Sequence, residues 1–470
     1  MNIYVVKSGD TLWSISRQFN TEISQISYGN QLKNVNILVI GQSLLIPEKN
    51  KEYIVQPGDT LSAISQKVNI GIQELIDFNQ LTNPSRLYIG QLVVLPYYTH
   101  IVKKGDTLYT ISYNYKVSLQ DILNANDISN PSLIYPDQKI RIPNKRKTIE
   151  VNSYITQTGA SGVAEVTGLG IYFTYLTPFT YSIKEDGSIS NLNDAGLIAA
   201  AESNNVDPLL VLTNYSGSMF DSDLAAAILR DESLQETLIA NLLKTMETKG
   251  YKGVNFDFEY VYPQDREHYN QFLRKVVKDF KPKGYKVSTA LAPKLKEEQK
   301  GLLYEAHDYK AHGEIVDFVV LMTYEWGWAG GRPWAIAPIN EVKKVLNYAV
   351  SVIPPDKILM GVPLYGRDWK VPWVDGTFAK TVSPVEAVEM AGKYGVRIQY
   401  NTEYQAPFFR YWDETGQQHE VWFEDSRSIQ AKHKTLDEYK LRGLSYWVLG
   451  SAFPQNWVLQ HAGYRVAKSE

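Results

Sequence analysis

The 470-residue sequence contains no cysteine and only seven histidines. Without thiols the chain can form no disulfide, no thiolate metal site and no cysteine nucleophile. The few histidines include no His-x-x-x-His pair, so the sequence does not predict a zinc enzyme. Several classes of structural and catalytic site are therefore excluded before any motif is considered.

Strong net charge and long apolar runs are also missing. The formal net charge of −3 gives no indication of a nucleic-acid or membrane-surface role. No window is apolar enough to span a bilayer. The first ten residues lack a basic region followed by a long apolar run, so they predict no secretory signal peptide. We expect a monomer without nucleic-acid or membrane partners.

The first third of the chain repeats a unit of about 48 residues three times. Each copy has a short apolar run, the motif Gly-Asp-Thr-Leu, a helix, a second helix that ends in asparagine, and a short strand that ends in proline. This order predicts a βααβ module whose first helix is capped by Asp or Thr. The motif consists of Gly9, Asp10, Thr11 and Leu12, then Gly58, Asp59, Thr60 and Leu61, and finally Gly105, Asp106, Thr107 and Leu108.

The three copies, at 1–48, 51–97 and 99–144, resemble the LysM module, which binds N-acetylglucosamine-containing glycans such as peptidoglycan and chitin. The resemblance implies a groove formed by the motif and by the loops near 36–38, 85–88 and 132–135. A turn followed by a helix cap would also explain the motif, and both interpretations can hold together. Three tethered sites imply avidity for a polymer.

From about residue 150 apolar runs alternate with charged helical stretches, which indicates parallel βα units. A length of roughly 320 residues favours an α/β fold, a (β/α)8 TIM barrel over 149–470. The interval from about 367 to 440 is too long for one crossover and predicts a small α+β insertion. We expect strands at 168–174, 208–213, 254–259, 287–292, 316–323, 358–363 and 444–449, and helices at 224–249, 264–280 and 339–353.

Two acids stand close together in the expected strand 254–259. Apolar and polar residues alternate there, so Asn255, Asp257 and Glu259 share one face. Neighbouring carboxylates push their pKa values apart, which lets one hold a proton near neutral pH while the other is ionised. The alternative is an ordinary amphipathic strand with its polar face in water.

This segment resembles the family 18 glycoside hydrolase signature, Asp-x-x-Asp-x-Asp-x-Glu. Asp257 and Glu259 match its last two acids, whereas Asn255 and Lys252 replace the other two. Three further family motifs follow in the family's order at later expected strand ends. They contribute Met322, Tyr324 and Glu325, then Tyr365 and Arg367, and finally Trp447, with Glu325 in place of the family's Asp.

The resemblance implies a role for each matching residue. Glu259 would be the general acid, and Asp257 would orient the substrate's own 2-acetamido group as it attacks the anomeric carbon. Tyr324 would hydrogen-bond that group. The remaining positions would bind substrate, and they are Asn255, Met322, Glu325, Tyr365, Arg367 and Trp447.

Some of these residues have simpler interpretations. Trp447 could only fill the barrel, Tyr365 and Arg367 could only stiffen the wall of the cleft, and Glu325 could only pair with Arg367.

The whole chain resembles the wall-lytic enzymes of endospore-forming bacteria, in which LysM modules precede a family 18 barrel. The resemblance implies an N-acetylglucosaminidase, a hydrolase of β-1,4 bonds in cortex peptidoglycan fragments, that works without metal or cofactor. It also implies a location in the coat and cortex region of the spore after synthesis in the mother-cell cytoplasm. The alternatives are a chitinase or chitooligosaccharide hydrolase, a catalytically silent glycan-binding lectin, and a structural spore-layer protein.

Overall fold

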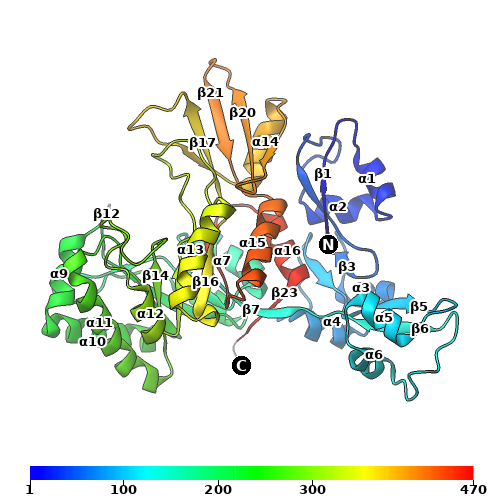
Figure 1. Cartoon of the computed structure of the whole chain (residues 1–470), viewed down its shortest axis with the longest axis horizontal. Helices are drawn as coiled ribbons and strands as arrows, with labels where there is room; N and C mark the ends of the chain where they lie inside the picture. The colour runs from blue at the N-terminus through cyan, green and yellow to red at the C-terminus, as the bar shows by residue number, and fades with distance from the viewer. Residues whose placement is uncertain (218, 469–470) are drawn as a thin grey trace. The chain divides into compact units, whose positions relative to one another are not determined.

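The computed structural model describes residues 1–217 and 219–468, which form two compact units (Figure 1). The first unit holds the three repeats together with Pro454–Arg465, a segment that includes helix α16 (Pro454–Gly463). The second unit holds Ile149–Phe453, the short segment Val39–Gln42 and the end of the chain. Among the helices of these described residues, none combines the length and apolarity that a bilayer crossing requires.

Each repeat is a βααβ module, as predicted, in which the two strands pair antiparallel. The first module comprises β1 (Asn2–Val5), α1 (Leu12–Gln18), α2 (Ile23–Gly29) and β2 (Ser43–Ile46). The second comprises β3 (Glu52–Ile54), α3 (Leu61–Val68), α4 (Ile72–Asn79) and β4 (Leu92–Val94). The third comprises β5 (Tyr97–Ile101), α5 (Leu108–Tyr115), α6 (Leu119–Asn126) and β6 (Lys139–Pro143).

One asparagine in every module ties the second helix to the second strand. In the first module, Nδ2 of Asn30 donates to the carbonyls of Ile26 and Leu45, and Oδ1 accepts from the Leu45 amide, each at 2.8 Å. The same three bonds recur at Asn79 and Asn126. Because an amide side chain mimics a peptide group, it satisfies backbone groups that neither the helix nor the sheet would pair.

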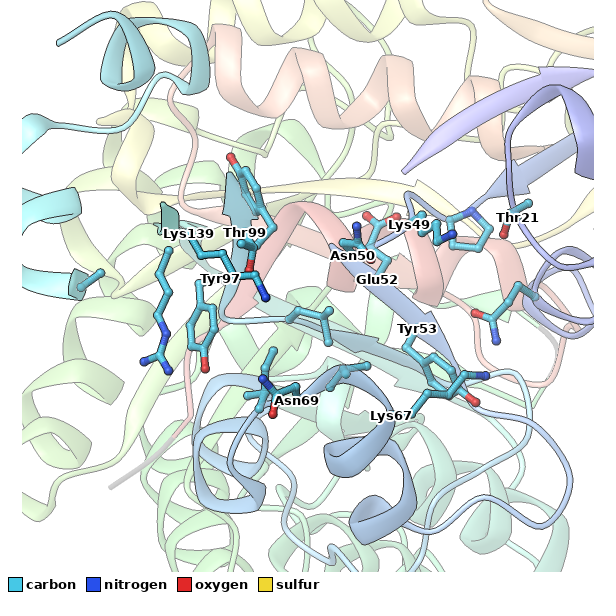
Figure 2. Close-up of a pocket in the computed structure, with 18 of the residues that line it drawn as sticks. Thr21, Lys49, Asn50, Glu52, Tyr53, Lys67, Asn69, Tyr97, Thr99 and Lys139 are labelled. Atoms are coloured by element: carbon cyan, nitrogen blue, oxygen red, sulfur yellow. The ribbon is translucent and has the colours of Figure 1, made fainter. Parts of the chain in front are cut away.

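The three modules together border a cavity of about 980 Å³ (Figure 2). Figure 2 shows Tyr53 beside Lys67 on this cavity, with Tyr97 elsewhere on its wall. Lys67 lies 4.9 Å from the centre of the Tyr53 ring and Arg141 lies 4.6 Å from that of Tyr97. Side-chain cations therefore already occupy one face of each ring.

The second unit is an eight-stranded parallel barrel, as predicted. Each strand pairs with the next along the chain, and the last pairs with the first to close the ring. The strands are β7 (Lys147–Ile155), β8 (Tyr175–Pro178), β10 (Asp207–Thr213), β13 (Gly253–Asp257), β14 (Lys286–Leu291), β15 (Phe318–Leu321), β16 (Ile358–Pro363) and β22 (Gly443–Trp447).

Helices connect successive strands along their outer side (Figure 1). In α11 the apolar side chains recur at three- and four-residue spacing and are buried, whereas the other faces carry charge. The connecting helices are α7 (Ala160–Leu169), α8 (Ala195–Glu202), α9 (Ser222–Arg230), α10 (Glu232–Lys249), α11 (Arg266–Phe280), α12 (Tyr309–Ile315), α13 (Ile339–Val352) and α15 (Ser426–Glu438).

Two predicted elements were wrong. The segment 168–174 is not a strand, because α7 runs into a 3-10 turn (Gly170–Tyr172) in which the absent side chain of Gly170 leaves room for Asn204. The helix expected at 224–249 is two helices, because Asp231 is extended and caps α10 through a hydrogen bond from Leu234. The first two barrel strands, β7 and β8, were not predicted.

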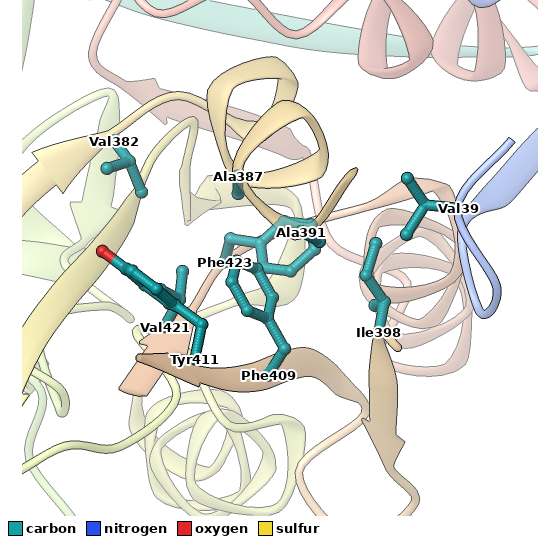
Figure 3. Packing of buried hydrophobic residues seen from close by; sticks show 9 residues of the cluster. All are labelled: Val39, Val382, Ala387, Ala391, Ile398, Phe409, Tyr411, Val421 and Phe423. Carbon is teal, nitrogen blue, oxygen red and sulfur yellow. The ribbon is translucent and has the colours of Figure 1, made fainter. Parts of the chain in front are cut away.

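Between β16 and α15 the chain forms a five-stranded antiparallel sheet with one helix, α14 (Pro384–Lys393). The strands are β17 (Gly366–Val371), β18 (Lys380–Val382), β19 (Gln399–Asn401), β20 (Ala406–Trp412) and β21 (Gln418–Trp422). Figure 3 shows Phe409 and Tyr411 of the sheet packed toward Ala387 and Ala391 of α14. This apolar layer gives the insertion a core of its own.

Candidate active site

The acidic run lies at the carboxyl end of β13, where barrel enzymes carry their chemistry. The strand ends at Asp257, two residues earlier than predicted, and Glu259 follows it in the loop. Phe256 and Phe258 lie against Phe272 of α11, with ring centres 5.4 and 6.3 Å away. The alternation predicted from the sequence thus places the apolar side chains against the helices and the polar ones toward the barrel interior.

Asn255 is buried and both ends of its side chain are hydrogen-bonded. Its Oδ1 accepts a 2.8 Å bond from the hydroxyl of Tyr154, and its Nδ2 donates a 2.9 Å bond to Oγ of Ser288. These bonds hold the amide between β7 and β14.

Asp257 and Glu259 form a coupled pair of carboxyl groups. Asp257 is 5% exposed, and its Oδ1 has no hydrogen-bond partner within the residues that the structure describes. Burial raises the pKa of Asp257. Burial also raises the pKa of Glu259 well above its usual range, and the nearby charge of Asp257 raises it further. The pair therefore retains a proton at pH values where isolated carboxyl groups are ionised.

Aromatic side chains from three other strand ends pack together, and one of them, Tyr324, lies near this pair. Tyr324, Tyr365 and Trp447 belong to one packed cluster, and Trp447 also meets the ring of Tyr154 at 5.4 Å. Burial raises the pKa of Tyr324, and the charges of Asp257 and Glu259 contribute to that rise. The barrel thus brings together residues that are up to 293 positions apart, the separation of Tyr154 and Trp447 (447 − 154).

Glu325 joins two residues of the neighbouring wall. Its Oε1 accepts hydrogen bonds from the Tyr365 hydroxyl and, at 2.9 Å, from Nη2 of Arg367. The guanidinium of Arg367 lies 4.8 Å from the centre of the Tyr365 ring. The expected pairing of Glu325 with Arg367 is therefore present. Met322 directly follows β15, where its amide donates to the Leu291 carbonyl, and its side chain is half-buried.

Two buried residues next to the acids were not predicted from the sequence. Asn214 hydrogen-bonds both backbone groups of Glu259, and His307 contacts the carbonyl of Phe258. Asn214 directly follows the predicted strand 208–213, so its position at a strand end was a usable signal. His307 lies on a loop, and no pattern in the sequence marked it.

In the modules, the Gly-Asp-Thr-Leu motif builds a turn and a helix start. Gly9 has φ of 85°, and Oδ2 of Asp10 accepts 2.7 Å bonds from the Tyr4 hydroxyl and the Lys7 amide. Thr11 caps α1 through a bond from Ser14, and Leu12 enters the core. Equivalent turns and caps form at Gly58 to Leu61 and at Gly105 to Leu108. The interpretation of the motif as a turn followed by a helix cap is therefore confirmed.

An exposed aromatic residue follows the motif in two of the modules. Trp13 is 63% exposed and Tyr109 is 72% exposed, whereas the equivalent residue of the second module is Ser62. Exposed apolar side chains also occur in the later loop of each module, at Val35 and Ile37, at Ile89, and at Leu133 and Tyr135.

Residues 154–452 match the family described as "Glycosyl hydrolases family 18", and residues 4–47, 53–96 and 100–143 match the LysM domain. The chain belongs to glycosyl hydrolase family 18 and carries three LysM domains. It is a glycoside hydrolase.

Individual proteins similar to this chain have more specific descriptions than the family. The chain is 45% identical over 474 aligned residues to the cortical fragment-lytic enzyme of Bacillus subtilis (strain 168), an alignment that covers 100% of this chain and 99% of that one. The cortical fragment-lytic enzyme of Bacillus anthracis is 50% identical over 299 residues, 63% of this chain and 69% of that one. The crystal structure of the Bacillus cereus spore cortex-lytic enzyme SleL resembles this fold with a TM-score of 0.79 and 39% identity, covering 99% and 98% of the two chains.

Proposed function

We propose that the protein is a peptidoglycan N-acetylglucosaminidase that hydrolyses β-1,4 bonds in spore cortex glycan or its fragments. Full-length similarity to cortical fragment-lytic enzymes supports the substrate, and it also supports a place of action in the cortex region of the spore. The observation that carries the proposal is the coupled pair of Asp257 and Glu259 at the carboxyl end of β13.

Glu259 is the general acid in this proposal. Its raised pKa favours the protonated form, from which it can donate to the glycosidic oxygen and later accept a proton from water. Asp257 is the charged partner. Its Oδ1, unpaired within the described chain, is available to the substrate's acetamido N–H, which it orients while the acetamido oxygen attacks the anomeric carbon. Such substrate assistance requires an N-acetyl group and gives retention of configuration.

Tyr324 and Trp447 complete the sugar site. The charges of both acids contribute to the raised pKa of Tyr324, which supports a role for its hydroxyl as a hydrogen-bond partner of the acetamido group. Trp447 is half-buried, which leaves part of its indole for the face of the reacting sugar. Glu325, Tyr365 and Arg367 supply a polar wall beside it.

The LysM domains hold the enzyme on its substrate. Each motif turn, with the later loop of the same module, forms a binding surface for N-acetylglucosamine-containing glycan. The exposed Trp13 and Tyr109 support this role in the first and third modules. Three weak sites on one chain raise the effective concentration of the barrel at a polymer.

Mass spectrometry of digestion products tests the proposal. Cortex peptidoglycan fragments and chitooligosaccharides are incubated in parallel with the protein and with the Glu259→Gln variant, which keeps the shape of the acid but cannot donate its proton. New reducing-end N-acetylglucosamine from the cortex fragments, absent with the variant, is the expected result. Cleavage of chitooligosaccharides alone would instead support the chitinase alternative, and cleavage of neither by the unmodified protein would contradict the proposal.

A further inference from the structure

The backbone around Glu259 is held by two buried side chains, one directly after the neighbouring strand β10 and one in the loop between β14 and α12. Nδ2 of Asn214 donates a 2.9 Å bond to the Glu259 carbonyl, and Oδ1 of Asn214 accepts a 3.0 Å bond from the Glu259 amide. Asn214 is fully buried and directly follows β10, which pairs with β13. Its amide therefore pairs with Glu259 as a neighbouring strand would, at the point where the ladder between β10 and β13 has ended.

The same amide has a further partner. Nδ2 of Asn214 also donates a 2.9 Å bond to the carbonyl of Asp221, the residue that caps α9. Both N–H groups and the oxygen of the Asn214 side chain therefore have hydrogen-bond partners. Its orientation is fixed, and so is that of the Glu259 backbone.

On the opposite side, His307 holds the preceding peptide. Its Nδ1 accepts a 2.8 Å bond from the Ala292 amide, so its Nε2 carries the proton and donates to the Phe258 carbonyl at 2.9 Å. Burial lowers the pKa of His307 to about 4, which keeps the ring neutral and this tautomer in place. The residue after the acid, Tyr260, has φ of 55°, and its carbonyl accepts from Ser222.

We propose that Asn214 is a positioning residue, which fixes the direction of the Glu259 side chain by clamping both backbone groups of that residue. This inference rests on the proposed role of Glu259 as general acid. A proton donor must lie within hydrogen-bond reach of the leaving oxygen, and a displacement of about 1 Å can cost about 100-fold in rate. Without the clamp, the backbone of Glu259 would lose its hydrogen bonds on the β10 side.

The alternative is that Asn214 only secures the loop between β10 and α9. The two roles differ in how they depend on the leaving group. A general acid matters most for a poor leaving group such as a sugar hydroxyl, and little for an aryl glycoside whose phenolate departs without protonation. Misplacement of Glu259 should therefore slow the two reactions unequally, whereas general loosening of the barrel should slow both.

Steady-state kinetics of the full chain test the inference. Wild type, Asn214→Ala and Asn214→Asp are compared on an N-acetylated oligosaccharide and on its dinitrophenyl β-glycoside. Asn214→Ala should lower kcat/KM, which reports the step in which the leaving group departs, about 10- to 100-fold on the oligosaccharide and less than about threefold on the aryl glycoside. Asn214→Asp keeps the shape and the acceptor but turns an oxygen toward the Asp221 and Glu259 carbonyls, so it should show the same pattern with a loss at least as large.

Asn126→Ala is the matched control, because Asn126 makes the same set of three bonds in the third module. It should lower thermal stability while leaving kcat on both soluble substrates within about twofold. Equal losses on both substrates with Asn214→Ala, or no loss on either, would overturn the positioning role while leaving the proposed function intact. A wild-type enzyme inactive on the oligosaccharide, or an active Glu259→Gln variant, would overturn both.

Discussion

The hydroxyl of Tyr154 donates a 2.8 Å hydrogen bond to Oδ1 of Asn255 across the interior of the barrel. The two residues belong to β7 and β13, which are not neighbours, because β8 and β10 lie between them in the ring. Both side chains are buried, so the bond is shielded from water. It gives the buried amide oxygen of Asn255 a hydrogen-bond partner.

Replacing Tyr154 by Phe should destabilise the barrel. The variant removes the donor and leaves a buried carbonyl oxygen of Asn255 unpaired, which costs about 1–3 kcal/mol of unfolding free energy. Denaturant unfolding of the two proteins measures the difference. The double variant Tyr154→Phe, Asn255→Leu should recover part of the loss, since no unpaired oxygen remains, and an unchanged single variant would contradict the contribution of this bond.

Replacing Asp257 by Asn should change the pH dependence of the reaction. The charge of Asp257 raises the pKa of Glu259, so its removal lowers that pKa. Glu259 must be protonated to donate, and the alkaline limb of the kcat profile should therefore move to lower pH. The maximal kcat should also fall by about 100-fold or more, because stabilisation of the developing positive charge is lost. An alkaline limb at the wild-type position would show that the two carboxyl groups are not coupled.

Glu259→Gln should stabilise the fold in a pH-dependent manner. The pKa of Glu259 in the folded state lies above its unfolded value of about 4.3. Below that value both states are protonated and the variant should unfold like the wild type. As the pH rises toward the folded pKa, ionisation favours the unfolded wild-type chain, and the fold loses stability that the variant retains.

The measurement is thermal unfolding of both proteins at about pH 4 and at about pH 8. The variant is expected to melt a few degrees higher only at the higher pH, as is common when a strained active-site group is removed. An equal difference at both pH values would be inconsistent with a raised pKa.

Trp13→Ala and Tyr109→Ala should each weaken binding to insoluble peptidoglycan. Truncating an exposed aromatic contact at a binding surface commonly costs about 1–2 kcal/mol, or about 5- to 30-fold in affinity. The double variant should lose more, because avidity requires at least two engaged modules. Binding isotherms in the Glu259→Gln background measure this without digestion. Trp412→Ala, which removes an exposed tryptophan from the insertion, is the control and should bind normally.

Much of the architecture could be predicted from the sequence. The three repeats could be recognised because their sequences resemble one another. Apolar runs located the strand ends that carry Asp257, Tyr324, Tyr365 and Trp447. Strand β7 was missed because it begins in a basic run, and the helix break at Asp231 was missed because the apolar periodicity continues across it. The local pattern of apolar and polar residues does not reveal strand β7 or the helix break, since both depend on how the segments pack.

The amino-acid sequence by itself determined the modules, the alternation that turns Asp257 inward, and the family to which the barrel belongs, because these follow from local periodicity and motif spacing. Only the tertiary structure decided which groups hold the acids. Asn214, His307 and Tyr154 reach the catalytic strand from residues 45, 49 and 101 positions away from their partners. Closure of the barrel sets these contacts, and it also buries Asp257 and partly buries Glu259, which raises their pKa values.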